Sequence, residues 1–147
     1  MNMMIRRSRS DESEQLIEIW RRSVDATHHF LSEQDRREID RQVCAFFPLA
    51  PLWVATTNED KPCALMLLSE QHLEALFVDP GFHGMGVGRQ LVTHALALIP
   101  GLTTDVNEQN TQAVGFYAKM GFVVSGRSAH DDHGRPYPLL HLRHSTR

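Results

Sequence analysis

The sequence predicts an α+β fold in which helices flank a mixed β-sheet. Helical apolar stripes and short strand-like runs follow one another in the order β-α-α-β-β-β-α-β-α-β-β. The 147 residues fit one domain, residues 1–147, and 41% of them are hydrophobic, as in a globular protein. A chain of this size buries roughly two thirds of its unfolded surface, so it builds a core without disulfides or metals.

The first half of the chain holds a predicted strand, two helices and a β-hairpin. Ser10 and Ser32 are candidate N-caps of the two helices, and Pro48 ends the second one. A polar turn at residues 58–62 separates two strand-like runs, which is a hairpin signature. The elements are expected at residues 4–6, 10–24, 32–47, 52–57 and 63–69.

The second half of the chain holds strands and helices separated by glycine-containing turns. Pro100 and Gly101 end one helix, and Gly121 is expected to end the next one in the left-handed conformation. The turn at residues 132–135 joins the last two strands. These elements are expected at residues 72–78, 89–99, 102–106, 110–120, 122–127 and 137–143.

Charge and cysteine content bear on the partners and the compartment. The formal net charge is −3, so no nucleic-acid partner is expected. All but two of the 15 basic residues are arginines, which grip anions through a planar fork. No apolar stretch approaches the roughly 20 residues of a membrane span, and residues 1–10 lack the apolar region of a signal peptide. Cys44 and Cys63 are therefore expected to be reduced thiols in a cytoplasmic protein without a membrane partner.

A glycine-rich loop follows the strand at residues 72–78 and leads into a helix. Gly84, Gly86 and Gly88 lack the Cβ atoms that would hold an anion away from the backbone, and the first amides of a helix attract negative charge. No Gly-Lys-Ser/Thr follows, so the loop is not a P-loop, and its spacing is not that of a dinucleotide fingerprint. Taken alone, the loop fits an anion site and a tight packing turn equally well.

A second motif lies downstream, where residues 106–122 read Val-Asn-Glu-Gln-Asn-Thr-Gln-Ala-Val-Gly-Phe-Tyr-Ala-Lys-Met-Gly-Phe. With the glycine loop, this motif resembles the GNAT family of N-acetyltransferases. The family's loop pattern, Arg/Gln-x-x-Gly-x-Gly/Ala, falls on residues 83–88. Its later signature, Asn-x-x-Ala-x-x-Phe-Tyr-x-Lys-x-Gly-Phe, is met from Asn110 to Phe122. The order of elements agrees over about residues 4–142.

The resemblance implies the GNAT fold, which is a mostly antiparallel, splayed sheet flanked by about four helices, and acetyl-CoA as the acyl donor. In the family, a strand backbone pairs with the pantetheine arm and polarises the thioester carbonyl, while the glycine loop holds the pyrophosphate. An asparagine bonds the pantetheine, and a tyrosine faces the sulfur. The cofactor-binding residues expected here are Leu76, Phe77, Val78, His83, Gly84, Met85, Gly86, Val87, Gly88, Arg89, Asn110 and Tyr117.

The expected reaction is direct transfer of an acetyl group from acetyl-CoA to a primary amine in a ternary complex. The ammonium must lose a proton before it attacks the thioester, and Glu74 or His72 is a candidate base, although a water chain would also serve. The leaving thiolate needs a proton, which the phenol of Tyr117 can give as a general acid. Alternatives without a catalytic role remain open. Tyr117 could be an aromatic residue that only packs in the core, and Glu74 and His72 could be ordinary surface residues.

The connection between the first two helices is expected to line the acceptor site. Its candidate substrate-binding residues are Trp20, Asp25, His29 and Phe30, and the Asp25 carboxylate could attract an ammonium. The alternative is an ordinary corner between two helices. The acceptor is either a small-molecule amine or a protein amine, and the chain is either a monomer or a homodimer. The histidines form no ligand set in sequence, so no metal is expected.

One residue departs from the family pattern. His83 stands where the family prefers Arg or Gln, and an imidazole is a weaker cation than a guanidinium near neutral pH. Weakened rather than abolished coenzyme binding is expected, because the backbone supplies most of the contact. This departure and the uncertain base leave a second hypothesis open, a catalytically silent acyl-CoA-binding sensor or interaction module on the same fold. A third is a different phosphorylated nucleotide in the glycine loop.

Overall fold

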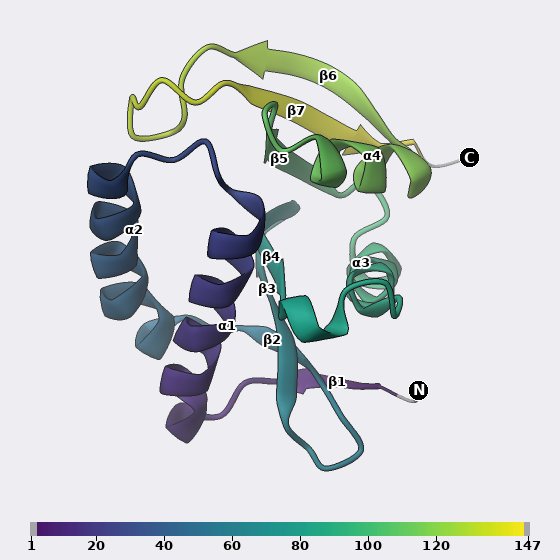
Figure 1. Ribbon diagram of the computed structural model, residues 1–147. Coiled ribbons are helices and arrows are strands. Elements are labelled where there is room, and N and C mark those ends of the chain that lie inside the picture. Colours follow the sequence, from purple (N-terminus) through teal and green to yellow (C-terminus); the bar gives the residue numbers. More distant parts are fainter. Residues whose placement is uncertain (1–2, 146–147) are drawn as a thin grey trace. The chain divides into compact units, whose positions relative to one another are not determined.

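The structure, a computed structural model, describes residues 3–145 and contains the predicted elements in the predicted order (Figure 1). The strand order is β1-β2-β3-β4-β5-β7-β6. β4 pairs with β5 in parallel, whereas β1–β2, β2–β3, β5–β7 and β6–β7 are antiparallel, which confirms the mixed, mostly antiparallel sheet. The main elements are β1 (Met4–Arg7), α1 (Ser13–Thr27), α2 (Glu33–Phe46), β2 (Trp53–Thr56), β3 (Pro62–Ser69), β4 (His72–Val78), α3 (Val87–Leu98), β5 (Thr103–Asn107), α4 (Thr111–Lys119), β6 (Phe122–Ser128) and β7 (Leu139–His144).

The chain divides into two compact units, which are described separately. Unit 1 comprises the chain up to Leu68 together with Ala75–Val92, and unit 2 comprises Ser69–Glu74 and the chain from Thr93 onward. β4 and α3 each contribute residues to both units. Each unit therefore carries a different part of the predicted coenzyme-binding residues.

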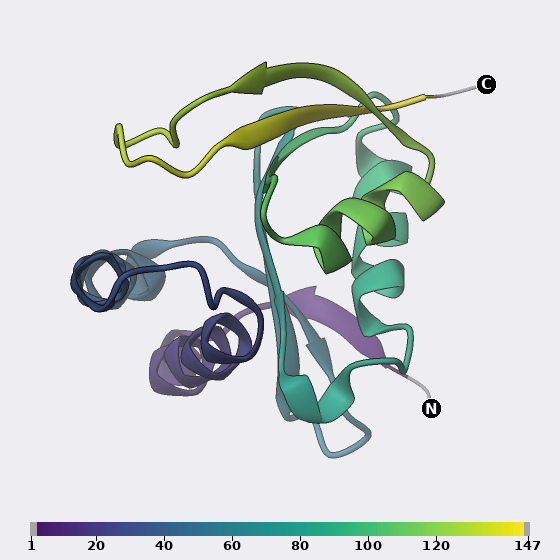
Figure 2. The ribbon, with the colours of Figure 1, turned by 45° about the horizontal axis from the view of Figure 1, so that its top comes forward.

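The core of unit 1 lies between α1, α2 and the strands beside them. Figures 1 and 2 show α1 and α2 side by side. Apolar residues recur at helical spacing on the inner side of α1, and burying each such side chain contributes about 1.5–3 kcal/mol. Ser32 caps α2 as predicted, because its hydroxyl accepts the Asp35 amide at 3.1 Å. The buried cluster comprises Leu16, Ile19, Trp20, Val24, Val43, Phe47, Leu52, Val54 and Leu65.

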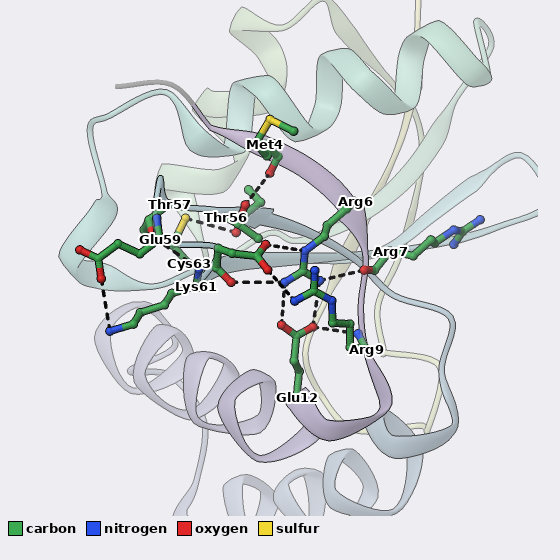
Figure 3. A network of polar contacts seen from close by, with 12 residues as sticks. Met4, Arg6, Arg7, Arg9, Glu12, Thr56, Thr57, Glu59, Lys61 and Cys63 are labelled. Atoms are coloured by element: carbon green, nitrogen blue, oxygen red, sulfur yellow. Dashed lines mark hydrogen bonds and ion pairs between the residues drawn. The ribbon is translucent and has the colours of Figure 1, made fainter.

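A network of charged side chains ties β1 to the hairpin and to the start of the first helix (Figure 3). Arg6 contacts Glu12 at 2.7 Å and Asp60 at 2.9 Å. The Glu12 carboxylate also accepts the Arg9 amide at 2.8 Å. The expectation that Ser10 caps the first helix is wrong: Ser10–Glu12 is a 3-10 turn (η1), and Glu12 is the residue that precedes α1.

Unit 2 is built on β5, β7 and β6, with α4 beside them and the first residues of β4 at one edge. β5 pairs with β7 over the full length of β5, from Thr103↔Arg143 to Asn107↔Leu139. Within residues 3–145, the pairing of β4 with β5 comprises two residue pairs, His72↔Thr103 and Leu73↔Thr104. This parallel contact is short for strands of seven and five residues. It fits the open sheet that the family resemblance implies.

Some element boundaries differ from the predicted ones. α3 begins at Val87 rather than at Arg89, so Gly88 lies in its first turn; the Val87 side chain is only 1% exposed, so the apolar stripe starts earlier. β7 begins at Leu139, because Pro138 has no amide for the ladder and the Tyr137 amide bonds the Arg135 carbonyl at 2.7 Å. Gly121 follows α4 with φ 95°, which confirms the predicted left-handed end.

Both cysteines are free, Cys44 at the surface and Cys63 in the interior. Burial raises the pKa of the Cys63 thiol to about 11, which keeps it protonated and unreactive. Across the described part of the chain, every helix is too short or too polar to pass through a bilayer.

Candidate active site

The end of β4 is fixed by Asp79, directly before the glycine loop. Its amide donates to the Cys63 carbonyl at 2.9 Å, and its carboxylate accepts the Gly81 amide at 3.2 Å. Arg22 of α1 reaches the same carboxylate at 2.7 Å. Burial raises the pKa of Asp79, but the hydrogen bonds from Arg22 and Gly81 outweigh it and lower that pKa below its ordinary value. A charged anchor therefore sets where the chain turns into the loop.

The loop itself depends on glycine conformation. Gly84 and Gly86 have φ of 79° and 78°, a region that other residues enter only at a cost. A Cβ placed on either glycine would meet no atom within 4 Å. A side chain at either position would therefore fit without a clash. The positive φ angle is the reason that these positions favour glycine. The Gln90 amide donates to the Gly86 carbonyl at 3.0 Å, which closes the first turn of α3.

The start of α3 is the predicted anion site. The first backbone amides of a helix have no acceptor within the helix, and the helix dipole adds partial positive charge there. Met85 and Arg89 are exposed beside this end, while Val87 points into the core of unit 1. The predicted pyrophosphate residues thus form one continuous segment, in which the backbone rather than the side chains provides the donors.

His83 does not simply replace the arginine or glutamine of the family pattern. Its Nε2 atom contacts the Val78 carbonyl at 3.2 Å, and a carbonyl can only accept, so this ring nitrogen donates. The imidazole therefore links the loop to the end of β4 by a hydrogen bond. It also occupies a carbonyl of the strand that was predicted to pair with the pantetheine.

Leu76, Phe77 and Val78 are half-buried at the end of β4 in unit 1. The Phe77 ring packs edge-on against the Trp20 ring, with 6.5 Å between the two ring centroids. Trp20 is only 3% exposed, and Arg36 lies over its ring at 4.9 Å. Trp20, a predicted acceptor-site residue, lies in the core of unit 1 and contacts Phe77 from there.

The other predicted acceptor residues lie at or near the surface of unit 1. Asp25 pairs with Arg36 at 2.8 Å and its side chain is 62% exposed, so its charge is partly compensated. His29 is exposed, and Phe30 is half-buried with its ring 5.2 Å from that of His28. Burial lowers the pKa of His28, which keeps that imidazole neutral and gives the corner an aromatic, weakly polar surface.

Tyr117 of α4 lies in the interior of unit 2 and is 6% exposed. The centroid of its ring lies 5.1 Å from that of Phe116 and 5.3 Å from that of Phe122, so Tyr117 packs against both aromatic rings. Its hydroxyl lies beside Thr104, which itself donates to the Leu73 carbonyl at 2.9 Å. Burial raises the pKa of Tyr117 well above its ordinary value, and the phenol keeps its proton.

Asn110 is the N-cap of α4, because its side-chain oxygen accepts the Ala113 amide at 3.2 Å. The carbonyl oxygen of the side chain is therefore engaged in the helix cap. Its amide group is the part that could face a pantetheine, and the cap fixes the direction of that group.

The two candidate bases lie close together on β4 and differ in their surroundings. His72 Nδ1 contacts the Thr103 hydroxyl at 2.7 Å, and its Nε2 lies 3.3 Å from the Asp105 carboxylate. Both ring nitrogens are thus engaged by unit 2. Glu74 is exposed. Of the two predicted bases, Glu74 is the more exposed.

Sequence reasoning missed a set of polar residues on the strands of unit 2. Asp105 joins His72 to His141, whose Nδ1 lies 2.6 Å from the same carboxylate. The Ser128 hydroxyl lies 2.6 Å from His141 Nε2. No local motif marks these residues, and strand pairing alone brings them together. In the described chain, residues 3–145, no group of three or more His, Cys, Asp or Glu side chains has an arrangement that could hold a metal ion.

Comparison with known proteins places this fold and loop in a family. Residues 10–138 match the model of the acetyltransferase (GNAT) domain. The chain therefore belongs to the GNAT family of acyl-CoA-dependent acetyltransferases, and it is an N-acetyltransferase. This confirms the family and the fold inferred from the two sequence motifs.

Several known proteins are similar to this chain. The chain is 63% identical to the peptidyl-lysine N-acetyltransferase YjaB of Salmonella typhimurium, over 97% of this chain and 98% of that protein. The solution structure of the apo form of YjaB from Escherichia coli is 58% identical, covers both chains fully and superimposes with a TM-score of 0.95. The N-acetyltransferase PaiA of Thermoplasma acidophilum, solved in complex with coenzyme A, shares the fold at 19% identity and a TM-score of 0.77, over 96% of this chain and 98% of that one.

Proposed function

We propose that this protein transfers the acetyl group of acetyl-CoA to lysine side chains of proteins, by direct attack in a ternary complex. The name of the Salmonella typhimurium relative, at 63% identity, supports the acceptor class. The single observation that carries the mechanism is Tyr117, a buried phenol that keeps its proton and sits at the position of the family's signature tyrosine. The two units act together as one N-acetyltransferase domain over residues 1–147.

Each step is assigned to groups of this chain. The backbone amides from Gly84 to Arg89 bind the pyrophosphate, and an amide of β4 donates to the thioester oxygen, where negative charge develops. Glu74 takes the proton of the lysine ammonium, because it is exposed whereas both nitrogens of His72 have partners. The amine attacks the carbonyl carbon, the C–S bond breaks, and Tyr117 protonates the thiolate.

The acceptor enters beside the corner between α1 and α2 in this proposal. His29 and Phe30 present ring surface there, and a lysine carries a long apolar stem that can pack on such rings. Asp25 is compensated by Arg36, so it attracts an ammonium only moderately. We therefore expect recognition of the lysine stem and of its neighbouring residues rather than of the charge alone.

Thiol release from acetyl-CoA tests the proposal. The panel contains Nα-acetylated peptides with one lysine, the same peptides with arginine in its place, and free small amines. We expect release with the lysine peptides and none with the arginine peptides. Coenzyme A at 100 times its Kd should also stabilise the fold by about 2.7 kcal/mol.

The same measurements separate the remaining hypotheses. Thermal stabilisation by coenzyme A without thiol release for any amine would favour an acyl-CoA sensor. Release with small amines alone would preserve acetyl transfer and overturn the peptide acceptor. Absence of any stabilisation at millimolar coenzyme A would contradict binding in the glycine loop.

A further inference from the structure

Unit 2 carries a chain of hydrogen-bonded side chains that acetyl transfer does not use. It runs across three strands, from Ser128 of β6 through His141 of β7 to Asp105 of β5. The Ser128 Oγ atom lies 2.6 Å from His141 Nε2, and His141 Nδ1 lies 2.6 Å from Asp105 Oδ1. This is the order of nucleophile, base and orienting carboxylate that defines a serine hydrolase triad on unrelated folds.

The direction of these hydrogen bonds follows from the chemistry of the groups. A carboxylate only accepts, so His141 Nδ1 must carry the proton that faces Asp105. In the neutral imidazole, Nε2 is then an acceptor, and the Ser128 hydroxyl donates to it. An imidazole held in this tautomer next to a hydroxyl is the arrangement that activates a serine.

The backbone of unit 2 holds this arrangement in place. Asp105 and His141 are direct partners across β5 and β7, so their side chains share one face of the sheet. A register shift between Val124 and Gly126 brings Gly126 opposite His141. A Cβ on Gly126 would lie 3.3 Å from the imidazole Cδ2 atom, so glycine leaves the room in which the ring reaches toward Ser128.

The second oxygen of the carboxylate is also engaged, since Asp105 Oδ2 lies 3.3 Å from His72 Nε2. Contacts on both oxygens fix the plane of the carboxylate and therefore the direction in which His141 is held. The His141 side chain is 36% exposed and Ser128 is half-buried. Both side chains are therefore partly accessible from solvent.

We propose that Ser128 is a nucleophile that accepts an acyl group from small activated esters and thioesters. Its Oγ attacks the acyl carbon and forms an ester bond, while its proton passes to His141 Nε2. The C–O or C–S bond of the donor breaks, and His141 returns the proton to the leaving alkoxide or thiolate. Water then attacks the acyl-serine with the same help from His141, which releases a carboxylic acid and restores Ser128. His141 is the base in both steps, and Asp105 is a positioning residue.

The proposal does not rest on lysine acetylation. It is tested on the full-length protein with a fluorophosphonate, which labels an activated serine and leaves ordinary serines unmodified. The labelled position is identified by mass spectrometry of peptides, and hydrolysis of p-nitrophenyl acetate is followed in parallel. Circular dichroism and thermal melting verify that each variant is folded.

We expect the label on Ser128 in the parent protein and its loss, together with the loss of ester hydrolysis, in Ser128→Ala. His141→Gln and Asp105→Asn should slow labelling by about 10²-fold or more, because general-base assistance is typically worth that much. Ser125→Ala is the matched control. Its hydroxyl also contacts His141, but at the backbone carbonyl (3.1 Å), so labelling should stay within about 2-fold of the parent.

A parent protein that carries no label at Ser128 overturns the proposal, as does labelling at an equal rate in His141→Gln. If that variant does not fold, Gly126→Ala provides the second test. It keeps all three triad residues but presses a methyl group against the imidazole, so slower labelling supports the proposal and an unchanged rate contradicts it.

Discussion

The glycine loop of unit 1 and the polar strands of unit 2 offer a ligand different parts of the polypeptide. The loop offers backbone amides, with two glycines at positive φ as its requirement. Unit 2 offers side chains, namely the phenol of Tyr117 and the set around Asp105. Backbone donors bind an anion in the ground state and in the transition state alike, whereas a proton donor matters only when the leaving group departs.

This difference predicts which kinetic constant changes when each region is mutated. Changes in the loop of unit 1 should raise KM for acetyl-CoA and leave kcat nearly intact, because they remove uniform binding. Changes at Tyr117 in unit 2 should lower kcat and leave coenzyme binding intact.

Tyr117→Phe should lower kcat by about 10²–10⁴-fold, because the thiolate loses its proton donor. Thermal stabilisation by coenzyme A should remain, since the ring still packs against Phe116 and Phe122. Tyr137→Phe is the control, as it makes the same change at another buried tyrosine of unit 2, and its kcat should match the parent. Steady-state thiol release measures kcat for both variants. A parent-like kcat in Tyr117→Phe would show that the phenol is a packing residue only.

Glu12→Gln tests whether the charged network of unit 1 serves stability rather than binding. Loss of the Arg6 pair should lower the free energy of unfolding by about 2 kcal/mol, the usual worth of a hydrogen bond to a charged group. Both kcat and KM should stay unchanged. Glu59→Gln removes a charge from a surface pair with Lys61, whose side chains are 78% and 74% exposed, and should have no measurable effect. Urea unfolding measures the difference.

The network also predicts the sign of a pH effect. The hydrogen bond from Arg6 lowers the pKa of Glu12, burial opposes this shift, and the Arg9 amide adds to it. A lowered pKa in the folded state stabilises the protein above the ordinary value of 4.5, and this contribution is lost as the pH falls through the folded value. Parent stability should therefore drop more steeply below that pH than the stability of Glu12→Gln. Equal slopes would contradict the assignment.

Gly86→Ala tests the loop without adding a clash. Its Cβ would have open space, so the cost is the positive φ, about 1–2 kcal/mol for a residue with a side chain. KM for acetyl-CoA should rise by about 5- to 30-fold, while kcat changes little. Gly101→Ala is the control, because that glycine also has open space and needs no positive φ. A loss confined to kcat would break the proposed division between the units.

Much of the fold and part of the candidate site could be predicted from contiguous sequence. The glycine loop and the signature at Asn110 are short, and their glycines and caps act on the backbone next to them. The Ser10 prediction was wrong because Ser10–Glu12 forms a 3-10 turn, in which the Glu12 carboxylate binds the Arg9 amide and the Arg6 guanidinium. A charged side chain that is buried against a distant partner leaves no local signal.

The polar set of unit 2 could not be predicted for a different reason. Ser128 and His141 are 13 residues apart, and Asp105 and His141 are 36 residues apart, each within an ordinary strand pattern. Their meeting depends on the register of β5, β7 and β6, which includes an irregularity near Gly126. A shift by one residue would turn His141 to the opposite face. The contact between these three residues can therefore be seen only once the pairing of the strands is known.

The smallest expected effect concerns the support of the loop rather than the loop itself. Arg22→Gln removes the charge that faces Asp79 at 2.7 Å, while the Asp79 carboxylate still accepts the Gly81 amide. Because the Arg22 side chain is 52% exposed, the pair is screened and the loop should loosen only slightly. KM for acetyl-CoA should rise about 2- to 5-fold at unchanged kcat, as expected for a partly exposed ion pair. Arg37→Gln, in a loose and exposed pair with Glu33 at 4.0 Å, should change neither constant. If Arg22→Gln lowered kcat instead, the anchor of β4 would act on the chemical step, and backbone binding and side-chain chemistry would not be separable in this protein.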